Sequence, residues 1–188
     1  MKYELIQLRD RVRRETSLPV LAEHANTAFR HVKPAKKTDC KSGCTYCCHT
    51  NVHPTLPELA RILHEIESWS DEQKAALKAK VGPVAQVQKD LGVADARKAG
   101  RCIMLNCDGT CAIYRARPLI CRGMNSLAVA GCKIFKPRVD PTQMRSALDA
   151  RDALGTEGYK LPMALDILLN QNSQDLTPAL VKFPTQRF

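Results

Sequence analysis

Apolar residues recur at helical spacing along most of this chain, and they predict a mostly α-helical protein. The first helix is expected over residues 2–14, where the apolar side chains lie roughly on one side: Leu5, Ile6, Leu8 and Val12. A second helix is predicted from Pro19 to Val32, because proline suits the first turn and Pro34 disfavours further helix. No segment shows a convincing strand-like alternation of apolar and polar residues.

The middle of the chain predicts two further helices. Pro57 opens the first, whose apolar stripe is Leu59, Ile62, Leu63, Ile66 and Trp69. The sequence S-D-E-Q that begins at Ser70 has the pattern of a capping box, and it predicts a helix over residues 71–80. The Gly-Pro pair at 82–83 predicts an interruption of this helix, which then resumes up to Lys89.

Shorter helices are expected in the second half of the chain. Residues 112–116 can form one helical turn, and Pro118 can open another that leads into Cys121. The last three helices are predicted over residues 141–154, 162–170 and 178–183. The expected fold is a single small helical domain over residues 1–188, organised around cysteine-rich metal-binding loops.

The size and composition agree with one soluble domain that has an aliphatic core. The chain has 188 residues, of which 44% are hydrophobic and only 5% aromatic. Its N-terminus has charges throughout and lacks the apolar region of a signal peptide. No apolar stretch approaches the roughly 20 residues that a membrane-spanning helix needs. We therefore expect a cytoplasmic protein with no membrane partner, in which thiols stay reduced.

Cysteine is the residue type that most narrows the function. The nine cysteines fall in two groups, which are Cys40, Cys44, Cys47 and Cys48, and then Cys102, Cys107, Cys111, Cys121 and Cys132. An odd number in a reducing compartment disfavours a disulfide network, whereas thiolates converging on metal explain the grouping. The cysteine-cluster core is thus expected over about residues 40–132, with helical flanks.

The first group argues for more than one metal centre. Cys44 and Cys47 form a C-x-x-C pair that can direct two sulfurs at one ion, and Cys40 can join them. Cys47 and Cys48 are adjacent, and successive side chains of an extended backbone diverge. One of these two sulfurs therefore serves a second ion, or one thiolate bridges two ions.

The second group has wider spacings. Cys107 and Cys111 bracket a D-G-T turn that can present both sulfurs inward, while Cys121 and Cys132 can close a site from separate elements. Neither group alone supplies two complete sites with standard spacing. We therefore expect a shared or multinuclear site that joins residues 40–48 to residues 102–132.

The spacing of the cysteines does not decide which metal they bind. Zinc suits a tetrahedral all-thiolate environment and is favoured, but iron–sulfur clusters also take four cysteines. His49 and His53 flank the first group and are alternative ligands. Basic residues near both groups would offset the charge of an anionic cluster: Lys36, Lys37, Lys41, Arg101, Arg122 and Lys133.

Two motifs resemble those of a known family. The run C-K-S-G-C-T-Y-C-C resembles the C-x-x-x-C-x-x-C-C motif of the YkgJ-like cysteine-cluster proteins. A second stretch is similar to that family's downstream motif, and its matching residues are Gly109, Cys111, Ile113, Tyr114, Arg117, Pro118, Cys121 and Arg122. The resemblance implies a zinc- or iron-chelating domain whose ligands are the nine cysteines apart from Cys107, which is additional to the pattern. Cys107 stays a candidate metal ligand, with three alternatives open: a ninth ligand, a replacement for another cysteine, or a free thiol. The resemblance also implies a distant relation to flagellin lysine N-methylases.

Three functions of different classes follow from these observations. The favoured one is a metal-binding protein in which zinc has a structural or regulatory role. An iron–sulfur protein with redox or lysine N-methylase-like activity is the first alternative, although no catalytic triad, paired-carboxylate site or phosphate loop is present. The second is a metal-stabilised nucleic-acid-associated module. The net charge of +10 permits a nucleic acid or another acidic partner, including a protein.

Overall fold

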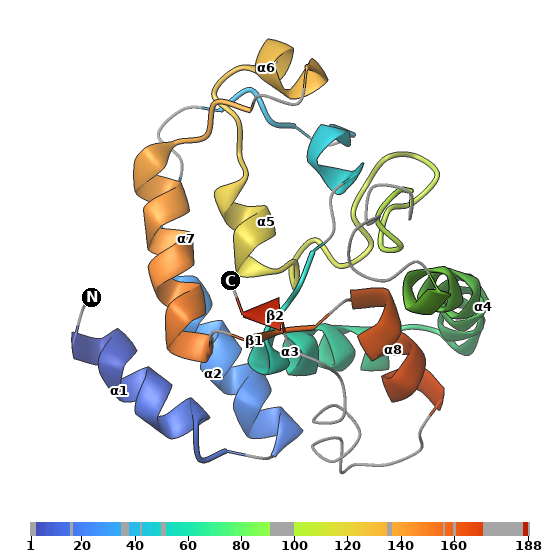
Figure 1. Ribbon diagram of the computed structural model, residues 1–188, viewed down its shortest axis with the longest axis horizontal. Coiled ribbons are helices and arrows are strands. Elements are labelled where there is room, and N and C mark those ends of the chain that lie inside the picture. Colours follow the sequence, from blue (N-terminus) through green and yellow to red (C-terminus); the bar gives the residue numbers. More distant parts are fainter. Residues whose placement is uncertain are drawn as a thin grey trace.

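Helices account for most of the secondary structure in the computed structural model (Figure 1). It describes residues 3–15, 17–34, 38–41, 43–49, 52–90, 100–134, 137–155, 157–159, 161–170 and 186–187. The helices are α1 (Tyr3–Val12), α2 (Leu18–Arg30), the 3₁₀ helix η1 (Tyr46–His49), α3 (Leu56–Glu67), α4 (Asp71–Asp90), α5 (Leu119–Gly123), α6 (Val129–Lys133), α7 (Pro141–Leu154) and α8 (Leu161–Asn170). Two short strands, β1 (Glu157–Gly158) and β2 (Gln186–Arg187), pair antiparallel.

One group of helices comprises α1, α2, α5 and α7. Its core is built largely from small residues, which let the helices approach closely: Leu5, Leu8, Ala25, Ala28, Leu119, Ala150, Ala153 and Leu154. Helix α7 begins at Asp140, whose side chain accepts hydrogen bonds from the backbone N–H groups of Thr142 and Gln143. This group fixes α5, the helix that contains Cys121.

A second group comprises α3, α4 and α8, together with the loop that contains Cys102 and Cys111. Its core is larger and more branched, and includes Leu59, Ile62, Val81, Ile103, Met104, Ile113 and Leu165. Because Ile103, Met104 and Ile113 are buried here, the apolar side chains of the loop fix its position against the helices.

The two groups meet where α2 packs on α3, through Leu21, Ala22 and Ala60. Figure 1 shows η1 and α6 at the end of the molecule opposite α1 and α2, with α5 between. The cysteine-containing helices η1 and α6 thus lie at one end of the helical framework, away from α1 and α2.

The predicted helical fold is confirmed, but residues 112–116 form turns rather than the expected helical turn, and α4 also differs from the prediction. The helix runs without interruption through Pro83, whereas the Gly-Pro pair predicted a break. Val81 and Ala85 are fully buried against the core shared with α8, and this packing offsets the backbone hydrogen bond that proline removes. The helix expected over residues 178–183 lies outside the described residues. Single-domain organisation stays a prediction.

Candidate metal centre

The first cysteine segment is held by backbone contacts to the loop before α6. The backbone N–H of Asp39 and the hydroxyl of Thr38 both donate to the carbonyl of Ser126, at 2.9 and 2.8 Å. The backbone N–H of Ser126 in turn donates to the sulfur of Cys40 at 3.0 Å. An N–H donor on a cysteine sulfur stabilises the thiolate, which is the form that binds metal. Cys40 is therefore fixed beside the α6 region by hydrogen bonds in both directions.

A tight turn places the adjacent cysteines on η1. Gly43 has φ +81°, a conformation that glycine adopts readily, and Cys44 follows it directly. Cys47 and Cys48 then lie side by side in sequence on the single 3₁₀ turn of Tyr46–His49. This short helix was not predicted, because four residues are too few to show a periodic pattern.

The second segment is a compact loop from Cys102 to Cys111. A bridge pairs Leu105 with Cys111, and the turn between them is closed by hydrogen bonds of Asn106, Asp108 and Thr110. From α4, the ammonium of Lys80 donates to the carbonyls of Ile103 and Leu105 at 2.5 and 3.1 Å. The loop is thus bonded to the helical framework as well as buried against it.

The two cysteine segments contact each other directly. The backbone N–H of Cys102 donates to the carbonyl of Cys48 at 2.7 Å. Gly109 lies so close to the first segment that an added Cβ would be 3.1 Å from Thr45 Cγ2 and 3.3 Å from the carbonyl oxygen of Gly43. As expected, the two cysteine segments lie next to each other, and their backbones are in direct contact.

Cys121 and Cys132 approach from two short helices. Cys121 lies on α5, whose first turn is bonded to α3 by the buried carboxylate of Glu58. One oxygen of Glu58 accepts from the backbone N–H of Leu119 at 2.7 Å, and the other accepts from the backbone N–H and the hydroxyl of Thr55. Cys132 is buried on α6, which contacts η1.

Electrostatic contacts place eight cysteines in two sets that overlap at Cys47. In the first set, Cys44 interacts with Cys40, Cys47 and Cys132. The second set is Cys48, Cys102, Cys111 and Cys121, in which Cys48 interacts with Cys102 and Cys121, and Cys111 with Cys102. Cys47 also interacts with all four members of the second set, so it lies between the two.

The pKa values of the adjacent Cys47 and Cys48 are shifted in opposite directions. A hydrogen bond from the Cys48 thiol lowers the pKa of Cys47 to about 6, whereas donating that bond raises the pKa of Cys48. Burial raises the pKa values of Cys44, Cys102, Cys111 and Cys121. Cys47 is therefore a thiolate at neutral pH. The four cysteines with raised pKa values stay protonated until a bound cation offsets the negative charge of their thiolates.

Cys107 differs from the other eight cysteines in its surroundings. It is exposed in the Asn106–Thr110 turn, while the others are buried or half-buried. The two histidines next to the first group also differ from each other. His49 is exposed at the end of η1. His53 is half-buried, and its backbone carbonyl accepts a hydrogen bond from the Arg151 guanidinium. Gly158 lies so close to His53 that an added Cβ would be 2.9 Å from this carbonyl oxygen.

The described part of the chain contains no group of three or more Cys, His, Asp or Glu side chains that is arranged to hold a metal ion. None of the nine cysteines forms a disulfide, and the sulfurs of each set lie within electrostatic reach on separate backbone segments.

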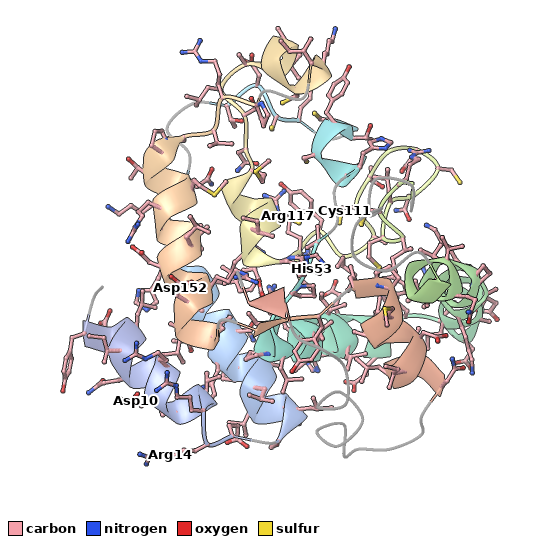
Figure 2. All side chains as sticks on the ribbon, viewed as in Figure 1. Asp10, Arg14, His53, Cys111, Arg117 and Asp152 are labelled. Atoms are coloured by element: carbon pink, nitrogen blue, oxygen red, sulfur yellow. The ribbon has the colours of Figure 1, made fainter. Side chains whose placement is uncertain are left out.

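Two cations act on the second cysteine set. Lys80 interacts with Cys102, and Arg117 interacts with Cys47 and Cys111. Figure 2 shows Arg117 and Cys111 in the middle of the molecule. Of the basic residues expected here, Lys36 and Lys37 lie outside the described residues. Burial lowers the pKa of Arg122 to about 10, with Arg61 and Arg117 adding to the effect.

Sequence reasoning missed Glu58, Arg61 and Lys80 as residues of this region. For Glu58 a signal exists, because T-L-P-E at residues 55–58 matches a capping box. Nothing local in the sequence indicates that Lys80 reaches the loop after Cys102.

A family model identifies the class of protein. The model, "CxxCxxCC: Putative zinc- or iron-chelating domain", matches residues 39–157, which is more than half of the chain and includes every cysteine. The chain belongs to this family. It is a metal-binding, cysteine-rich protein, as its two motifs predicted.

Other comparisons add no relative. No curated protein and no solved structure matches the chain. The relation to flagellin lysine N-methylases stays a prediction. No helix among the described residues has the length and apolar character to cross a membrane.

Proposed function

We propose that this CxxCxxCC protein holds two zinc ions in adjacent tetrathiolate sites, and that both ions are structural. The first ion takes Cys40, Cys44, Cys47 and Cys132, and the second takes Cys48, Cys102, Cys111 and Cys121. The observation that carries the proposal is that Cys44 interacts with Cys40, Cys47 and Cys132, whereas Cys48, Cys102, Cys111 and Cys121 interact with one another. Cys47 interacts with both sets and is assigned to the first ion, because the second set already supplies four thiolates.

Zinc suits these sets better than the alternatives. Four thiolates complete a tetrahedral shell, and a closed shell with no open position is typical of structural zinc rather than of catalytic zinc. The cysteine spacing also departs from the runs of bacterial and plant-type ferredoxins. The iron–sulfur interpretation remains the outcome that would replace this one.

The surroundings of the sulfurs support thiolate formation. Two tetrathiolate zinc sites have negative net charge, and Arg117 and Lys80 lie where they reduce it. The backbone N–H of Ser126 already donates to Cys40. Because the hydrogen bond from Cys48 lowers the pKa of Cys47 to about 6, the sulfur of Cys47 is available to the first ion as a thiolate.

A structural role follows from how little regular structure surrounds the sites. The segments that contain the eight cysteines form only η1, α5 and α6, which have four or five residues each, and connecting loops. Such short helices are marginal without external support. Each ion would join one segment of the first group to the second group, and so cross-link positions far apart in the sequence.

Serine variants of one cysteine from each set test the division. In zinc-loaded protein measured by native mass spectrometry, Cys40→Ser should lose the first ion and keep the second, and Cys102→Ser should do the reverse. Loss of both ions in each variant would contradict two separate tetrads and indicate one cluster with shared ligands.

A further inference from the structure

Three arginines gather next to the second cysteine set. The guanidinium groups of Arg61 on α3 and Arg122 on α5 lie over the ring of Phe29, at 3.9 and 4.3 Å from its centroid. Both also donate to the carbonyl of Arg115, each at 2.5 Å. Arg117 interacts electrostatically with Arg122, so three positive charges lie in one small region.

These arginines have donor groups with no partner. Arg61 Nη1, Arg117 Nε and Arg122 Nε are buried and lack a hydrogen-bond partner among the described residues. A buried N–H of a charged group is costly when unsatisfied, and such a group usually indicates a water or ion that belongs at the site.

Nearby carboxylates offset part of the charge but do not bond to the open donor groups. Glu58 and Glu65 interact electrostatically with Arg61, but both oxygens of Glu58 already accept hydrogen bonds from Thr55 and Leu119. No salt bridge within the described residues involves any of the three arginines. The three open donor groups therefore have no hydrogen-bonded or ion-paired anion among the described residues.

We propose that Arg61, Arg117 and Arg122 form a receptor for an oxyanion, the phosphate or carboxylate group of a small ligand. The planar guanidinium presents its donors in a fork that fits such groups, and three of them provide the charge. The aromatic ring of Phe29 fixes two of these forks in place.

The three arginines lie next to the cysteines of the candidate metal centre. Arg117 acts on Cys47 and Cys111, and Arg122 follows the cysteine of α5 directly. All three arginine residues are half-buried, while their unpartnered N–H groups are buried. A bound oxyanion would lie beside the second cysteine set, on the side of α3 and α5.

Calorimetric titration of the zinc-loaded protein tests the proposal. Inorganic phosphate should bind saturably at one site per chain, with an affinity that falls as sodium chloride is raised. A parallel titration with acetate distinguishes a phosphate ligand from a carboxylate ligand, because the preferred oxyanion saturates the site at a lower concentration than the other. Absence of saturable binding of both ions would overturn the proposal.

Substitutions then locate the binding. Arg122→Gln and Arg61→Gln should each raise the dissociation constant about tenfold or more, as expected for the loss of a charge-assisted hydrogen bond. Arg30→Gln is the matched control, since Arg30 is an exposed arginine of α2 and its loss changes the net charge equally. An equal loss of affinity in the control would overturn the assignment.

A third measurement distinguishes oxyanion binding by these arginines from a role that only offsets the negative charge of the cysteine thiolates. In the wild-type protein, addition of phosphate should shift the NMR signals of the arginine Nε–H groups while the zinc content stays constant. Signals that stay unchanged, combined with a lowered zinc content in Arg117→Gln, would show that these arginines serve the metal alone.

Discussion

The backbone N–H of Cys102 donates a 2.7 Å hydrogen bond to the carbonyl of Cys48. These residues belong to cysteine groups that lie far apart in the sequence, and this hydrogen bond joins the two segments directly. Their side chains fall in the same electrostatic set.

Cys107 and Cys111 form a matched pair for testing the ligand set, because they flank the same turn. Cys107 is exposed, whereas Cys111 is half-buried and interacts with Cys47 and Cys102. Cys107→Ser should keep the wild-type metal content and melting temperature, and Cys111→Ser should lose one ion. Metal loss in the Cys107 variant would place this thiol in the coordination shell.

Alkylation should reveal the different proton affinities of the adjacent cysteines. With a pKa of about 6, Cys47 in the metal-free reduced protein is about nine-tenths ionised at pH 7, and Cys48 is protonated. Iodoacetamide should therefore label Cys47 first, at a rate that decreases as the pH falls through 6. Mass spectrometry of the labelled peptides reads the order, and faster labelling of Cys48 would contradict the assignment. Zinc loading should protect both residues.

Glu58 is expected to be important for stability. Its buried carboxylate accepts three hydrogen bonds and joins the starts of α3 and α5. Glu58→Gln brings an amide N–H₂ against these donors, so it should lower the free energy of unfolding by about 2–4 kcal/mol. Urea denaturation measures the change, and Glu67→Gln on the exposed face of α3 should be nearly neutral. Equal effects of both substitutions would refute this role.

Two glycines with similar backbone conformation test the contact between the cysteine segments. Gly109 and Gly100 have φ +81° and +80°, but only Gly109 has atoms within 4 Å of an added Cβ. Both alanine variants should show the cost of positive φ, about 1 kcal/mol. Gly109→Ala should lose more stability and also weaken zinc binding, as measured by competition with a chelator. The same zinc affinity in both variants would argue against this contact.

The sequence predicted the helices of the framework well, because each is long enough to show its apolar stripe. Helix α7 has the predicted bounds, and the capping box at Ser70 is present, since its backbone N–H donates to Gln73 Oε1 at 2.9 Å. Pro83 misled the prediction, since local propensity does not reveal packing against α8.

The candidate site was predictable in its residue types but not in its pairing. Spacing indicated that one of Cys47 and Cys48 serves a second ion or that one thiolate bridges two ions, and the motif set Cys107 apart. The partition of the remaining cysteines depends on tertiary contacts between the loops, as does the approach of Lys80 and Arg117. Such contacts leave no periodic signal in the sequence.

The most direct test of the central claim is the content of metal and acid-labile sulfide per chain, in protein purified without oxygen. The account predicts a colourless protein with two zinc ions and no sulfide. A brown protein that contains iron and sulfide would contradict it and establish an iron–sulfur cluster instead.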